Sequence, residues 1–264
     1  MSRLAMALSR AREQGRLALV PYLTAGDPDP ATTRDIVWML KEEGADIVEL
    51  GVPFSDPVAD GVTNQRAAER ALAGGMTLAG TLALASEIRA TCQLPLMLFT
   101  YFNPIYRMGI EVFARQAAEA GIDGVLVTDL PPEEAAAHRD ALIDAGIDPV
   151  FMLSPTSGPE RVRLVAEMTR GFIYYVARTG VTGARDTLPA GLRDEVARLR
   201  LTTGLPVAVG FGLSRREHLE ALAGAADAVV VGSALVQRIA DTGGGPAAVE
   251  AVRELVRELR GGEA

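Results

Sequence analysis

The chain has 264 residues, 48% of them hydrophobic, so it contains enough apolar material for a large core. Its 34 acidic and 26 basic residues give a net charge of -8, which argues against nucleic acid or an anionic membrane surface as a partner. The single cysteine, Cys92, excludes an internal disulfide and suits a reducing cytoplasm, and no apolar run approaches the ~20 residues of a membrane helix.

The first predicted element is an amphipathic helix over residues 1–14, which lacks the continuous apolar centre of a secretory signal. After it, eight apolar strands alternate with helical patterns. The strands are predicted at 17–25, 46–51, 95–101, 124–129, 148–154, 171–177, 206–211 and 228–232. The helices are predicted at 30–44, 64–73, 77–90, 112–120, 131–145, from 159, 192–201, 214–223, from 233 and 246–260.

This alternation predicts an α/β fold, a single (β/α)8 TIM barrel with an extra N-terminal helix, rather than an open doubly wound sheet. The strands are apolar almost throughout, as expected for a parallel sheet covered on both faces. We expect residues 1–264 to form one barrel domain, with the first helix closing its lower end. Functional groups should then lie at the carboxyl ends of the strands.

Two carboxylates follow the second predicted strand. Glu49 interrupts its apolar run, at a position where burial raises the pKa of a carboxyl group. The next loop is rich in turn residues and ends in Asp60 and Gly61, so it can bring a second carboxylate over the end of the strand. Paired acids in unlike surroundings suggest divided catalytic roles.

Glycines stand where the last two strands give way to helices. Gly210, Gly212 and Gly232 leave room for a ligand oxygen to approach backbone N–H groups, and Ser233 opens a short helix that precedes the last one. Barrels commonly bind phosphate after these two strands. The sequence therefore predicts a phosphate site there, to which Gly183 in the preceding loop is added.

A long polar loop is predicted at 177–189, with the length and glycine content of a closing lid. Side chains at other strand ends suit a flat aromatic ligand, namely Tyr22, Phe99, Tyr101, Leu126 and Tyr174.

Three further aromatic or basic rings carry no predicted function. His138 and His218 lie among charged neighbours on helical segments and are expected at the surface, with no spacing typical of a metal site. Trp38 is expected to pack in the core.

Several segments carry a family resemblance. Residues 48–61 read VELGVPFSDPVADG, and further matches occur at LVPYLTAGDP (19–28), YYVARTGVTG (174–183), VGFGLS (209–214) and VVGSA (230–234). Together they resemble the tryptophan synthase alpha chain family over nearly the whole chain. The resemblance implies cleavage of indole-3-glycerol phosphate to indole and glyceraldehyde 3-phosphate, a retro-aldol reaction of tryptophan biosynthesis.

The resemblance also implies roles for individual residues. Glu49 and Asp60 match the catalytic pair, Thr182 matches a threonine that meets the aspartate on lid closure, and Arg178 matches an arginine that orders the lid. The positions that match the phosphate contacts are Gly183, Phe211, Gly212, Gly232 and Ser233.

The resemblance further implies a cytoplasmic α2β2 heterotetramer with a tryptophan synthase beta chain. No cofactor or metal is expected in this chain, whereas pyridoxal phosphate (PLP) is expected in the beta chain. Val62 and Asn64 depart from the family pattern beside the loop that meets that partner, and so leave the strength of coupling open. Tyr22 and Ala177 are smaller departures.

Three other functions remain open from the sequence. The chain could be another phosphosugar enzyme on the same barrel, such as an isomerase, or a catalytically silent regulatory partner. A stand-alone indole-forming lyase is the closest alternative. An isomerase would need its acid and base on other strand ends, and a silent partner would typically lack one of the two carboxylates.

Overall fold

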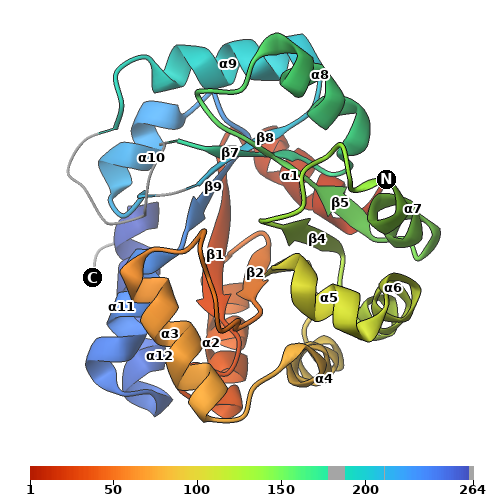
Figure 1. The fold of residues 1–264 in the computed structure, drawn as a ribbon. Helices are drawn as coiled ribbons and strands as arrows, with labels where there is room; N and C mark the ends of the chain where they lie inside the picture. The colour runs from red at the N-terminus through yellow and green to blue at the C-terminus, as the bar shows by residue number, and fades with distance from the viewer. Residues whose placement is uncertain (178–187, 211, 262–264) are drawn as a thin grey trace.

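The computed structural model describes residues 1–177, 188–210 and 212–261. Parallel strands form the centre and helices surround them (Figure 1). In the described residues the strands are β1 Ala18–Thr24, β2 Val48–Gly51, β3 Leu96–Thr100, β4 Gly124–Val127, β5 Asp148–Val150, β6 Met152–Leu153, β7 Ile173–Val176, β8 Val207–Gly210 and β9 Ala228–Val231. The helices are α1 Arg3–Glu13, α2 Pro30–Glu42, α3 Val62–Ala73, α4 Leu78–Arg89, α5 Phe102–Met108, α6 Ile110–Glu119, α7 Ala136–Asp144, α8 Pro159–Met168, α9 Leu192–Thr203, α10 Arg216–Leu222, α11 Ser233–Thr242 and α12 Gly245–Arg260.

The sheet closes on itself through one short segment. Its strand order is β5-β4-β3-β2-β1-β9-β8-β7-β6, so β5 and β6 stand at opposite ends of that order. These two strands are nevertheless neighbours in the chain, separated by Phe151 alone, whose carbonyl accepts a 3.0 Å hydrogen bond from the backbone N–H of Tyr174. Residues 148–153 therefore act as the single strand that the sequence predicts, and the predicted (β/α)8 barrel is confirmed.

The N-terminal helix α1 fills the lower end of the barrel, as predicted. Leu4, Leu8 and Ala11 are buried and pack in one cluster with the inward-facing residues at the base of the strands. A Cβ at Gly124 would lie 2.5 Å from Cδ1 of Leu4, so only glycine leaves room for this leucine. The barrel is closed below and presents the carboxyl ends of its strands at the other end.

Some local predictions were wrong. Trp38 is 42% exposed, because its neighbours Ile36, Val37 and Met39 take the buried face of α2 and the helical repeat turns Trp38 outward. His138 and His218 are buried rather than at the surface. His138 lies between the rings of Phe102 and Phe113, and Phe102 belongs to α5, a helix absent from the prediction.

Neighbouring residues on β7 face opposite sides of the barrel wall. Tyr174 packs with the interior cluster, whereas Tyr175 packs with the cluster between the sheet and the helices. The alternation means that one strand contributes to two separate environments.

Among the described helices, none alone is long and apolar enough to cross a membrane. Only α3 and α4 taken together, bent by 91° at the break between them, reach those limits of length and composition.

Candidate active site

Glu49 lies in the wall of the barrel, on β2, and faces the interior. It pairs in register with Tyr22 on β1 and Met97 on β3. The residue is 1% exposed, and neither carboxylate oxygen has a hydrogen-bond partner among the described residues. Burial, followed by the charge of Asp60, raises the pKa of Glu49 to about 8. At neutral pH the side chain is therefore mostly protonated and can donate a proton inside the pocket.

Asp60 lies just before α3 and lines the same pocket. The hydroxyl of Tyr101 donates a 2.7 Å hydrogen bond to Oδ2 of Asp60 and accepts one of 3.0 Å from the backbone N–H of Ala59. Burial raises the pKa of Asp60, and hydrogen bonds from Tyr101 and Asn64 oppose that rise. The two acids thus differ: Asp60 has donors that favour its ionised form, and Glu49 has none.

Aromatic side chains form the walls of the pocket. Tyr22 meets Phe99 edge to face with ring centroids 5.6 Å apart, and both line the pocket with Tyr174. A Cβ at Gly51 would lie 2.2 Å from the hydroxyl oxygen of Tyr22, so glycine is required beside this ring. Such walls suit a flat aromatic ligand and exclude water from the carboxyl groups.

Two predicted lining residues occupy different places. Leu126 is buried in the interior cluster beneath the pocket and does not line it. Tyr101 is buried behind Asp60, against the ring of Phe54 at 5.0 Å, and acts by holding the carboxylate.

The predicted phosphate residues that the structure describes converge on the other side of the pocket. Gly212, Gly232 and Ser233 all line it, and Gly212 has a φ of +86°, which favours glycine. Ser233 begins the ten-residue helix α11, whose first N–H groups lack intrahelical acceptors and can bind an anion. In the loop after Gly212, Nδ1 of His218 accepts a 3.2 Å hydrogen bond from the backbone N–H of Ser214.

Two lining residues were not predicted as part of the site. Val230 belongs to β9, and its apolar side chain carries no signal that separates it from other core valines. Asn64, in the first turn of α3, lines the pocket with its Oδ1 buried and unpaired among the described residues. A polar residue four positions after Asp60 could have indicated this contact, because the first turn of α3 places its side chain within hydrogen-bond reach of Asp60.

Four predicted residues lie outside the described part of the chain: Arg178, Thr182, Gly183 and Phe211. In the part that is described, no three His, Cys, Asp or Glu side chains come together as a set of metal ligands.

The chain is similar to known proteins over nearly its whole length. A family model described as tryptophan synthase alpha chain matches residues 8–262. The tryptophan synthase alpha chain of Dechloromonas aromatica is 49% identical over 263 residues, covering 99% of this chain and 98% of that protein.

Two solved structures are also similar. A chain from the tryptophan synthase α2β2 complex of Pyrococcus furiosus has a TM-score of 0.87 and 42% identity, covering 92% of this chain and 98% of that one. A chain from Mycobacterium tuberculosis tryptophan synthase has a TM-score of 0.89 and 37% identity, covering 98% and 97% respectively.

Proposed function

The chain belongs to the tryptophan synthase alpha chain family, whose reaction is the cleavage of indole-3-glycerol phosphate, and we propose that Glu49 and Asp60 carry out that cleavage. One observation carries the assignment: a buried carboxyl group without hydrogen-bond donors faces the same pocket as a carboxylate that has two. Pairs of acids whose surroundings shift their pKa values by different amounts are typical of acid–base catalysis.

Glu49 supplies the proton transfers. Its carboxyl group donates a proton to the ring carbon of the indole that bears the side chain. The resulting carboxylate removes the proton of the hydroxyl group on the adjacent carbon. The electrons of that O–H bond form the aldehyde carbonyl, the carbon–carbon bond breaks, and its electrons restore the aromatic ring. Glu49 ends the cycle protonated, so the reaction consumes no proton overall.

Asp60 stabilises the intermediate charge. Protonation of the ring carbon places positive charge at the indole nitrogen, and an ionised carboxylate near that N–H stabilises the transition state more than the neutral substrate. Tyr101 fixes this carboxylate through its 2.7 Å hydrogen bond. The phosphate is held at Gly212, Gly232 and Ser233, where its binding energy positions the bond to be broken.

This scheme needs only proton transfers and fixed charges, so it calls for no cofactor in this chain. We place PLP in a beta chain that docks on the barrel mouth. Val58, Val62 and Tyr106 are 80%, 56% and 70% exposed around that mouth, an apolar surface suited to burial by a partner. The α2β2 complex of the Pyrococcus furiosus relative supports the same assembly. A cytoplasmic location accords with the unpaired Cys92.

Steady-state assays of indole release test the proposal. The isolated chain should release indole slowly from indole-3-glycerol phosphate, and a cognate beta chain should raise turnover at least ~10-fold, equivalent to about 1.4 kcal/mol. Full activity without any response to the beta chain would indicate a stand-alone lyase. Absence of indole under both conditions would contradict the assignment of the reaction to this chain.

A further inference from the structure

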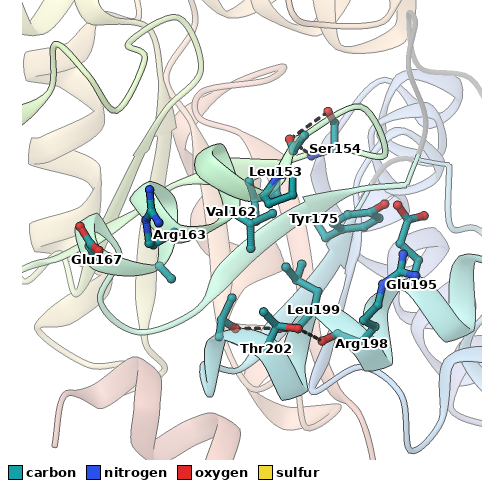
Figure 2. Close-up of a pocket in the computed structure, with 14 residues that line it drawn as sticks. Leu153, Ser154, Val162, Arg163, Glu167, Tyr175, Glu195, Arg198, Leu199 and Thr202 are labelled. Carbon is teal, nitrogen blue, oxygen red and sulfur yellow. Dashed lines mark hydrogen bonds between the residues drawn. The ribbon is translucent and has the colours of Figure 1, made fainter.

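A second cleft lies on the outside of the barrel, between α8 and α9. Its volume is about 740 Å³, enough for a small organic molecule. Leu153 on β6 and Tyr175 on β7 form its floor, with Val162 on one wall and Leu199 on the other (Figure 2). None of the residues that line this cleft lines the catalytic pocket.

The floor of the cleft carries one buried polar group. Tyr175 is 2% exposed, and its hydroxyl has no hydrogen bond of normal geometry among the described residues. Figure 2 shows the phenol pointing toward the carboxylate of Glu195 on α9. Burial, followed by that carboxylate, raises the pKa of Tyr175, so the hydroxyl stays protonated and can donate a hydrogen bond. A buried donor without a good acceptor is costly, and a ligand that pairs with it removes the cost.

The charges at the rim balance. Arg163 and Glu167 stand on α8, and Glu195 and Arg198 stand on α9, so each wall contributes one positive and one negative side chain. A rim of this kind gives neither an anion nor a cation a net electrostatic advantage. The occupant that fits is uncharged, with an apolar body for Leu153, Val162 and Leu199.

We propose that this cleft binds a small, uncharged, apolar molecule bearing a hydroxyl group. The ligand hydroxyl accepts a hydrogen bond from Tyr175 and donates one to Glu195, because a hydroxyl can do both at once, whereas an ether oxygen only accepts and an amide N–H group only donates. The ligand would contact β7 on the face opposite Tyr174, which lines the catalytic pocket.

A methyl-detected NMR titration tests this site with two probes of equal shape, 4-ethylphenol and ethylbenzene, which differ by the hydroxyl alone. We expect 4-ethylphenol to shift the methyl signals of Leu153, Val162 and Leu199. Val230 lines the catalytic pocket, so shifts of its methyl signals distinguish binding in that pocket from binding in the cleft. Ethylbenzene should bind the cleft about 25-fold more weakly, because it loses two hydrogen bonds that are each worth about 5-fold.

Variants complete the test. Tyr175→Phe should weaken 4-ethylphenol about 5-fold and leave ethylbenzene unchanged. Ala166→Trp, which fills the cleft from α8, should weaken both probes at least ~10-fold, whereas Ala247→Trp on the exposed face of α12 should weaken neither. Three outcomes would overturn the proposal. Millimolar 4-ethylphenol could shift no methyl signals, it could shift those of Val230 alone, or the two probes could bind with equal affinity. The wild-type titration decides these outcomes even if Ala166→Trp fails to fold.

Discussion

The hydroxyl of Tyr101 donates a 2.7 Å hydrogen bond to Oδ2 of Asp60, although the two residues lie 41 positions apart in the chain. Tyr101 follows β3, whereas Asp60 lies in the loop after β2. The contact therefore ties two adjacent strand ends together and favours the ionised form of one acid. Glu49 has no hydrogen-bond donor among the described residues, and burial raises its pKa to about 8, so at neutral pH this acid holds a proton.

Tyr101→Phe should lower turnover about 10-fold, because Asp60 loses the donor that favours its charged form. The Michaelis constant should change little if the hydroxyl acts through Asp60 rather than on the substrate. In assays of the isolated chain Tyr106→Phe is the control, since Tyr106 is 70% exposed and lies beyond the pocket. Equal loss in both variants would mean that Tyr101 only supports the local fold.

Glu49→Gln should lower turnover at least ~100-fold, because an amide cannot exchange the proton that the cleavage requires. Glycerol 3-phosphate should still bind with wild-type affinity, as measured by calorimetry, since the phosphate lies on the other side of the pocket. Glu87→Gln, on the exposed face of α4, should leave both quantities unchanged. Turnover retained in Glu49→Gln would remove this residue from the mechanism.

The same variant should be more stable than wild type at neutral and alkaline pH. Glu49 has a pKa of about 8 in the folded chain and 4.5 as its ordinary value, so the folded state holds the proton more tightly. The contribution of Glu49 to the free energy of unfolding is therefore complete below pH 4.5 and is lost as the pH rises toward 8.

Urea unfolding at several pH values measures this effect. The stability gained by Glu49→Gln should grow between pH 5 and 8, by at most about 1.4 kcal/mol per pH unit. A difference between the two proteins that does not vary with pH would show that the carboxyl group is not buried as described.

Gly212→Val should weaken glycerol 3-phosphate binding at least ~10-fold, because a side chain there occupies the space through which the phosphate reaches the backbone. Valine is also strained at a φ of +86°. Gly204→Val controls for strain, since Gly204 has a φ of +68°, with no atom within 4 Å of an added Cβ, and lies outside the pocket. Calorimetry should find weaker binding in Gly212→Val alone.

The barrel could be predicted from sequence because its strands are continuous apolar runs and its helices end at recognisable breaks. Glu49 could be found because an ionised carboxyl group is unfavourable within a buried apolar strand, and its presence there indicates a function. The burial of His138 could not, since the charged residues Arg139 and Asp140 follow it and its contact with Phe102 depends on α5. Asn64 was recognised as unusual, but its contact with Asp60 exists only once α3 has packed against β1 and α11. The roles given to Arg178, Thr182, Gly183 and Phe211 remain predictions.

Helix α1 has a further consequence for the order of events in catalysis. With Leu4 seated against Gly124, the base of the barrel offers a product no exit through the described residues. Both the indole and the aldehyde leave by the opening through which the substrate entered. Whichever leaves second therefore blocks the next turnover, and a protein docked over that opening receives what is released before it mixes with the solvent.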